Sequence, residues 1–258
     1  MGPLWALLLI VALTLPVLLA LVYLNLIGRV FLLLGLSPIG ALLLLAGSLI
    51  GSLINIPLTR RRIVVADPEL ATLPDWLRRL APIFHYYPPA VAEQVIAINV
   101  GGALIPIVFS IYLLTLPGTS WLAAGIATLV IAIIANALAR PLTGVGVAMP
   151  VIIPLLATAL VSRLLIVALG LPTVSAAPVA YIAGTLGTLI GADLLNLPRI
   201  LRGSLVEGAS EGVRVLDVEK LDGAPLAKER VYVASIGGAG VFDGVFFTGI
   251  IAPLLAVL

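Results

Sequence analysis

The sequence predicts an all-α polytopic transmembrane helix bundle of about seven spans, with a small cytoplasmic β-hairpin before the last span. Of the 258 residues, 62% are apolar and only 10% are charged, and the mean hydropathy is +1.26. Apolar stretches of roughly 20 residues, the length that crosses about 30 Å of hydrocarbon, recur along the chain. An ordinary soluble domain is about 25% charged, so soluble folds are excluded. We expect residues 1–258 to form a single membrane domain.

Seven apolar stretches are the predicted spans, and their boundaries are approximate by several residues. They are Pro3–Ile27, Pro38–Leu58, Val91–Leu114, Ser120–Leu138, Val147–Leu169, Ala176–Leu197 and Ala239–Leu258. The first stretch lacks a basic leading region and stays apolar for about 25 residues, which favours a span over a signal peptide.

The basic residues predict the orientation of these spans. Twelve of the 14 lysines and arginines fall in the second, fourth and sixth connections, and only Arg29 and Arg163 lie on the other side. Cytoplasmic loops collect Lys and Arg, so we expect a multi-pass protein of the cell (inner) membrane with a cytoplasmic N-terminus and an outside C-terminus. The bilayer is the predicted partner. This topology explains the net charge of +2, and no nucleic-acid partner is expected; the sequence leaves the oligomeric state open.

Two cytoplasmic connections are long enough to have structure of their own. In the connection 59–90, the stretch LPDWLRRLAPIF places apolar and charged residues at helical spacing, which predicts a helix in the membrane interface. In the connection 198–238, Val213–Val218 and Arg230–Ser235 each alternate with period two on either side of the turn signal LDGAP. This pattern predicts a β-hairpin.

Three acidic residues lie inside predicted spans. A carboxylate near the bilayer centre costs a few kcal/mol and therefore indicates a functional site. Glu93 is close enough to a span end for its side chain to reach the headgroups. Asp193 and Asp243 each stand about four residues from the cytoplasmic ends of consecutive spans, hence about 6 Å below one surface. Because consecutive antiparallel spans are usually neighbours, we expect a catalytic dyad in which the two carboxyl groups share a proton.

The residues around the two aspartates are candidate peptide-binding positions. They are Gly191, Gly237, Gly238, Gly240 and Gly244, together with Val231 and Val233 of the second predicted strand. Glycine lets an extended peptide or a second helix come close, so tight helix packing is the alternative interpretation of the glycines. Asp243 has an alternative role as the N-cap of the last helix.

Further polar residues define a second candidate site and limit the chemistry. Glu93, Asn99 and Arg140 form a candidate secondary polar site. The chain has no cysteine and a single histidine, His85, which excludes cysteine-based and multi-histidine metal sites. We expect neither a metal nor a cofactor, because a dyad and a water molecule suffice for hydrolysis.

Three motifs carry a resemblance to a known family. NVGGALIP, GTLIGADLL and SIGGAGxFDGxF are similar to stretches of an uncharacterised family of prokaryotic multi-pass membrane proteins, a domain of unknown function. The resemblance extends from about residue 60 onward. It implies a membrane protein and no established activity.

More distantly, the aspartate pair resembles the GxGD-type intramembrane aspartyl proteases, namely presenilins, signal peptide peptidases and prepilin peptidases. In presenilin-like members, the aspartates lie on two consecutive spans, and a strand before the second aspartate receives the substrate as a further strand. The resemblance implies catalytic roles for Asp193 and Asp243, with RVYVAS as that strand. Here Phe242 replaces the glycine before the second aspartate, and Ala192 replaces the tyrosine usual before the first.

Three functions are consistent with these features. The first hypothesis is an intramembrane aspartyl hydrolase that cleaves a transmembrane or juxtamembrane peptide through Asp193 and Asp243. The alternative is a transporter or channel in which these carboxylates, with Glu93 and Asn99, bind a cation or proton. The third is a membrane assembly protein without enzymatic activity, so the sequence leaves open whether the protein is an enzyme.

Overall fold

The computed structural model describes residues 12–18, 25–26, 28–65, 90–142, 146–199, 230–238 and 244–258. These parts of the chain are mostly helical and include a small β-sheet. The predicted interfacial helix, the predicted strand Val213–Val218, Gly240 and Asp243 all lie outside the described residues.

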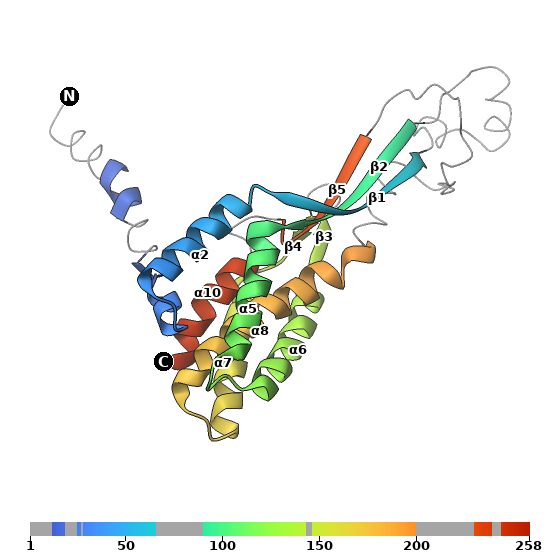
Figure 1. Cartoon of the computed structure of the whole chain (residues 1–258). Coiled ribbons are helices and arrows are strands. Elements are labelled where there is room, and N and C mark those ends of the chain that lie inside the picture. Colours follow the sequence, from blue (N-terminus) through green and yellow to red (C-terminus); the bar gives the residue numbers. More distant parts are fainter. Residues whose placement is uncertain are drawn as a thin grey trace, which may run out of the picture.

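A central helix, α8 (Ala176–Thr188), forms the middle of the bundle, and most of its residues are buried. It packs against four other helices, shown in Figure 1: α5 (Ile105–Thr115), α6 (Trp121–Leu138), α7 (Ile152–Ala168) and α10 (Gly244–Val257). Its sequence AAPVAYIAGTLGT is rich in small side chains, which let neighbouring helix backbones approach closely. The core is therefore built on close backbone contact.

Glycines mark the closest of these helix contacts. A Cβ added at Gly184 would lie 2.7 Å from the carbonyl oxygen of Thr248 in α10, and one at Gly187 would lie 2.8 Å from Cβ of Ile131 in α6. Both distances are shorter than an ordinary van der Waals contact. The two glycines thus fix the spacing of α8 from two different neighbours.

The outer faces of the surrounding helices are apolar. On α6, exposed aliphatic residues recur at helical spacing and include Leu129, which is 63% exposed; on α7 they include Leu160, which is 60% exposed. Monomeric soluble proteins rarely expose contiguous apolar patches of more than a few hundred Å². Such faces are suited to contact with lipid.

Two of the described helices are long and apolar enough to cross a membrane. They are Trp121–Leu138 and Thr173–Arg199. The other apolar helices described are shorter, and they are Pro38–Gly51, Val100–Thr115, Ile152–Ala168 and Thr248–Val257. Helices of spanning length are thus found for two of the predicted spans, and the full set of seven is not confirmed.

The predicted boundaries were wrong for the second and third spans. Helix α2 ends at Gly51 and is followed by strand β1 (Asn55–Val65). Strand β2 (Ala90–Asn99) occupies the first nine residues (91 to 99) of the third predicted span, and helical structure begins only at Val100. Strand β2 contains the uninterrupted apolar run Val95–Ile98, and a short apolar run of a strand cannot be told from a helical segment by its periodicity. Hydropathy therefore joined this run to the helix that follows it.

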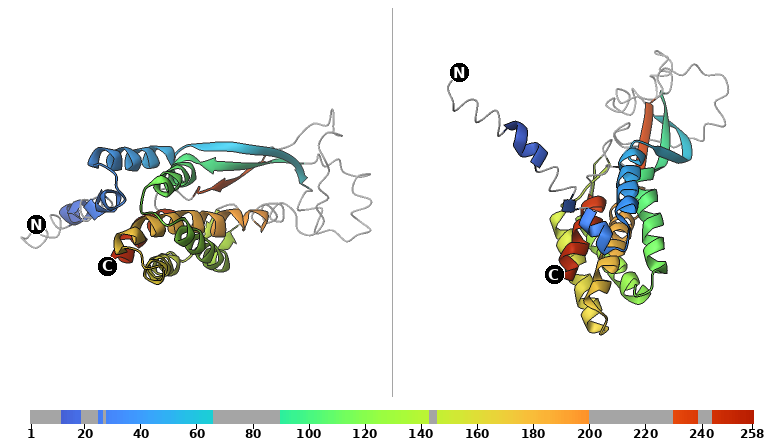
Figure 2. Two further views of the ribbon diagram at one scale, coloured as in Figure 1. Left: turned by 60° about the horizontal axis from the view of Figure 1, so that its bottom comes forward. Right: turned by 60° about the vertical axis from the view of Figure 1, so that its left-hand side comes forward.

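The main sheet has the strand order β1-β2-β5, where β5 is Arg230–Ile236. Strand β1 runs antiparallel to β2, and β5 runs parallel to β2. The prediction of a strand at Arg230–Ser235 is therefore confirmed, but its partner in the described structure is β2. Figures 1 and 2 show the sheet projecting away from one end of the helices.

The connections alternate between the two ends of the bundle. The main sheet contains strands from two connections: β1 and β2 lie between α2 and α5, and β5 lies between α8 and α10. The short ribbon β3 (Arg140–Leu142) and β4 (Gly146–Ala148) connects α6 with α7 near the same end (Figure 1). At the opposite end, the turn before α2 lies beside the end of α5, where a Cβ at Gly35 would lie 3.8 Å from the Leu116 side chain. The described parts of the connections α2–α5, α6–α7 and α8–α10 thus share one end of the bundle.

Candidate functional site

Asp193 lies in a π-helical turn, η3 (Leu189–Leu194), that continues α8. The backbone N–H of Leu195 donates to the carbonyl of Ile190 at 2.9 Å, which is the i to i+5 spacing of a π-helix. Such turns are rare and frequently occur at functional sites. Asp193 is half-buried, whereas most of α8 is fully buried. The π turn is therefore where the central helix presents a carboxylate.

The carboxylate of Asp193 accepts a hydrogen bond from the turn that follows β5. The backbone N–H of Gly237 donates to Asp193 Oδ2 at 2.7 Å. Gly237 has a φ of +67°, in the left-handed region that favours glycine, and Gly238 closes the turn by donating its N–H to Ser235 O at 3.2 Å. The hydrogen bond from Gly237 to Asp193 connects the π turn at the end of the central helix to the end of the sheet.

Gly237 also contacts a second π-helical turn, η1 (Val100–Leu104), which leads from β2 into α5. A Cβ at Gly237 would lie 2.7 Å from the carbonyl carbon of Gly102 and 2.8 Å from the Cβ of Ala103. The two backbones therefore meet at van der Waals distance. Gly237 is held between the turn that carries Asp193 and the turn that begins α5.

Asn99 supports this arrangement from the end of β2. Its side chain is fully buried and makes three hydrogen bonds: Nδ2 donates to Ser52 O at 2.8 Å and to Asn55 Oδ1 at 3.1 Å, and Oδ1 accepts from the N–H of Gly102 at 2.7 Å. The hydroxyl of Ser235 also donates to Asn55 Oδ1, at 2.6 Å. Asn99 and Asn55 together hold β1, β5 and η1 in place.

The three residues of the predicted secondary polar site lie on strands of two different sheets. Arg140 lies in β3, in the second sheet, and its side chain is exposed. Glu93 lies in β2, where its backbone pairs with Arg62 and Val231, and its side chain lies outside what the structure describes. No hydrogen bond joins Asn99 to Arg140 among the described residues. Asn99 has the different, structural role just described.

The glycine nearest Asp193 serves helix packing. A Cβ at Gly191 would lie 2.8 Å from the Cβ of Ala135 in α6, and its carbonyl accepts from Asn196 Nδ2 at 3.0 Å. The structure therefore supports the alternative interpretation of Gly191, which is tight helix packing. Gly244 is the first residue of α10.

The predicted peptide-binding strand lies at an edge of the sheet. Val231 and Val233 lie in β5, which pairs with β2 on one side and has no partner strand on its other side among the described residues. The side chain of Val233 is 59% exposed. An edge strand presents unpaired backbone N–H and C=O groups to a further chain.

The start of α10 lies beside the π turn of Asp193. Val245, two positions after Asp243, is buried in one cluster with Leu189 and Ala103. Leu189 is the first residue of the turn that carries Asp193. Val245, which follows Asp243 by two positions, therefore lies close to the turn that carries Asp193.

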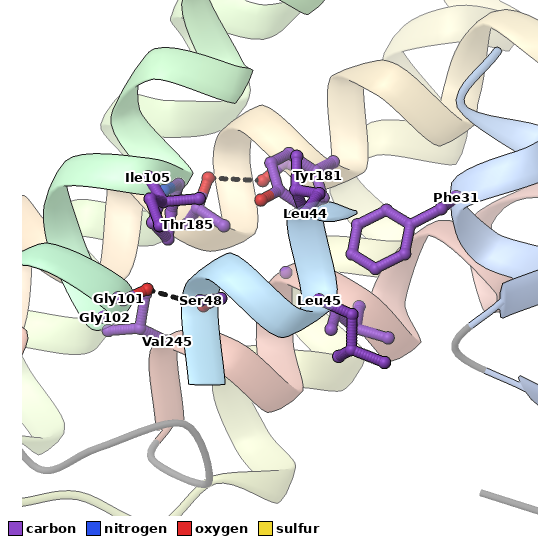
Figure 3. A pocket seen from close by; sticks show the side chains of 13 residues that line it. Phe31, Leu44, Leu45, Ser48, Gly101, Gly102, Ile105, Tyr181, Thr185 and Val245 are labelled. Atoms are coloured by element: carbon purple, nitrogen blue, oxygen red, sulfur yellow. Dashed lines mark hydrogen bonds between the residues drawn. The ribbon is translucent and has the colours of Figure 1, made fainter. Parts of the chain in front are cut away.

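A pocket lies next to this site, between α2, α8, α10 and the start of α5 (Figure 3). Its lining residues are Phe31, Leu44, Leu45, Ser48, Gly101, Gly102, Ile105, Pro106, Tyr181, Thr185, Val245, Gly249 and Ile250. The hydroxyl of Ser48 donates to Gly101 O at 2.7 Å, and that of Thr185 donates to Tyr181 O at 2.7 Å. Because backbone carbonyls already engage these hydroxyls, the pocket is suited to apolar groups.

Two other observations complete the description of the site. Among the described residues, no group of three or more His, Cys, Asp or Glu side chains could hold a metal ion. The sequence analysis did not identify Asn55 and Ser235 as residues of this site. Each stands near an end of a β-rich stretch, beside a turn, and this position was the available signal.

Comparison with known proteins gives one match. The model of a protein family described as Protein of unknown function (DUF1614) matches residues 49–255, which include every described residue of the Asp193 site. No curated protein and no solved structure matches the chain.

Proposed function

We propose a function for this chain, which belongs to the DUF1614 family of proteins of unknown function: it is an intramembrane aspartyl hydrolase that cleaves a transmembrane or juxtamembrane peptide, with Asp193 and Asp243 as the acid/base pair. The observation that carries the proposal is the 2.7 Å hydrogen bond from the N–H of Gly237 to Asp193 Oδ2. Asp243 follows Gly237 by six positions (243 minus 237) and directly precedes α10.

Both ends of the segment that carries Asp243 support a close approach of the two aspartates. Gly237, before this segment, is hydrogen-bonded to Asp193. Val245, after it, is buried together with Leu189 of the π turn. A short chain segment anchored on both sides near one carboxylate is well placed to bring a second carboxylate to it.

Two such carboxyl groups can hydrolyse a peptide bond without a cofactor. When they share one proton, the ionised group removes a proton from a water molecule, whose oxygen attacks the carbonyl carbon. The protonated group donates its proton to the carbonyl oxygen. Collapse of the tetrahedral intermediate then breaks the C–N bond, and the amine leaves with a proton from the acid/base pair. The N–H of Gly237 orients Asp193 for this work.

Strand β5 supplies a binding surface for an extended substrate. Its unpaired edge offers backbone hydrogen bonds to an added strand, and the exposed side chain of Val233 lies on it. Strand β5 leads directly into the Gly237 turn. A peptide paired along β5 would therefore run toward Asp193.

The proposal includes a multi-pass topology in the cell (inner) membrane. We place the sheet end of the bundle in the cytoplasm, with a cytoplasmic N-terminus and an outside C-terminus, because the basic residues gather in the connections at that end. The alternation of the connections between the two ends and the exposed apolar faces of α6 and α7 support seven crossings.

The transporter alternative has less support at Asn99. Its amide is committed to three hydrogen bonds within the fold, which leaves little capacity to bind a cation. A role in membrane assembly without chemistry is the outcome of the following test if neither cleavage nor transport is observed.

The test uses the full chain reconstituted in lipid vesicles with a panel of transmembrane peptides. Asp193→Asn and Asp243→Asn should each lower the cleavage rate at least 100-fold, and the double variant should be scarcely worse than either single variant, because the two groups act as a unit. Asp217→Asn, in the sixth connection, is the matched control and should cleave like wild type. Wild-type protein that cleaves no peptide but moves ions in a manner dependent on Asp193 would replace the hydrolase with the transporter.

A further inference from the structure

A second surface feature lies at the end of the bundle opposite the Asp193 site. It is an open groove of about 580 Å³ between the helical residues before Gly35 and the last turn of α10. The lining residues are Leu26, Arg29, Leu32, Leu33, Leu254, Val257 and Leu258. We name it the Arg29 groove.

The walls of the Arg29 groove are aliphatic apart from Arg29. Leu32 is 48% exposed and Leu33 is 37% exposed. Exposed leucines around a concave surface match the chemistry of a hydrocarbon chain, since apolar groups in a membrane associate through van der Waals packing. The side chains of the groove thus combine an apolar wall with one cation, Arg29.

Arg29 is held in position and retains free donors. Its Nε donates to Asn25 Oδ1 at 2.9 Å, which fixes the plane of the guanidinium group. Within the described residues, Arg29 has no ion pair and its two terminal NH₂ groups have no hydrogen-bond partner. Arg29 precedes the turn at Gly35 by six positions, or about 9 Å along a helix, and a side chain of this length reaches the headgroup region.

We propose that the Arg29 groove binds a phospholipid, with the phosphodiester on the guanidinium of Arg29 and an acyl chain along the leucines. Guanidinium groups bind phosphate oxygens in a bidentate manner, and the charge of Arg29 complements the anionic phosphate. The aliphatic wall complements the chain. This site is separate from the Asp193 site and does not depend on the proposed hydrolase activity.

The experiment compares two lipids on the detergent-solubilised full chain by native mass spectrometry. Phosphatidylglycerol and diacylglycerol with the same acyl chains differ in the phosphate headgroup. Wild type should retain phosphatidylglycerol at least tenfold better than diacylglycerol, which corresponds to about 1.4 kcal/mol. Arg29→Gln should lose this preference, whereas Arg140→Gln, an exposed arginine at the other end of the bundle, should keep it.

A groove-filling variant tests the acyl-chain part of the site. Leu33→Trp should lower retention of both lipids at least fivefold while Arg29 remains intact, because the indole occupies the channel. Inorganic phosphate should not compete with the lipid, since it lacks the chain. Equal retention of phosphatidylglycerol by wild type and Arg29→Gln, in variants that elute from size exclusion like wild type, overturns the proposal. So does retention unaffected by Leu33→Trp.

Discussion

Replacement of Gly237 by alanine probes the contact on which the candidate site depends. In the native fold, a Cβ at this position would lie 2.7 Å from the carbonyl carbon of Gly102, and ordinary contacts begin at 3.4 Å. The two backbones must therefore separate by about 0.7 Å (3.4 minus 2.7). A shift of this size lengthens or misaligns the 2.7 Å hydrogen bond to Asp193.

The expected cost of Gly237→Ala has three parts. A left-handed conformation costs a residue with a Cβ about 1 to 2 kcal/mol. Overpacking against Gly102 and Ala103 costs about 1 to 3 kcal/mol. Loss of a hydrogen bond to a carboxylate costs about 1.5 to 3 kcal/mol. Even the lower values together give a loss of about 3.5 kcal/mol in the free energy of unfolding.

A second glycine provides the matched control. Gly170 has a similar φ of +64°, and no atom lies within 4 Å of a Cβ built there. Gly170→Ala should therefore cost only the conformational part, about 1 to 2 kcal/mol. Unfolding in mixed detergent and SDS micelles, followed by tryptophan fluorescence, measures both variants on one scale.

A double-mutant cycle isolates the hydrogen bond from the other two parts. In an Asp193→Ala background the acceptor is absent, so Gly237→Ala should cost about 1.5 to 3 kcal/mol less than in wild type. Equal costs for Gly237→Ala and Gly170→Ala would refute the close-contact argument. Additive single and double variants would show that the bond to Asp193 contributes nothing to stability.

Two further predictions concern topology and the support of the site. Tags at Met1 and within residues 205–224 should report from the cytoplasm and a tag after Leu258 from outside, in an accessibility assay on intact cells; both termini on one side would contradict the span count. Asn99→Ala should lower the free energy of unfolding by about 3 kcal/mol, at about 1 kcal/mol for each of its three hydrogen bonds. Asn99→Asp should lose more than Asn99→Ala in the same detergent unfolding assay, because a buried carboxylate oxygen would replace the amide donor and face the acceptors Ser52 O and Asn55 Oδ1; a smaller loss would count against this role.

Sequence reasoning located the helices whose own sequences are apolar over most of their length. The predicted span Ser120–Leu138 became the helix Trp121–Leu138. The predicted span Ala176–Leu197 begins at Ala176, which is the first residue of α8. In these stretches hydropathy and helical period agree, so a sum over apolar residues is enough to find them.

The sheet was only partly predictable, because its pairing is not local. The alternating pattern of Arg230–Ser235 gave the strand, yet its partner β2 lies more than a hundred positions away and was interpreted as part of a span. The bond between Gly237 and Asp193 could not be foreseen for a related reason. Its donor is a backbone N–H, which every residue except proline has, so no residue type marks it in the sequence.

The parallel pairing of β2 with β5 has a consequence for synthesis of the chain. Ile98 pairs with Ile236, so 138 residues (236 minus 98) must be translated after the first partner before the second exists. At about 5 to 20 residues per second, the edge of β2 waits roughly 7 to 28 s for its neighbour, while four further helices leave the ribosome. An unpaired strand edge invites pairing with another chain. We therefore expect nascent chains stalled before residue 230 to be the species most prone to aggregation and most dependent on chaperones.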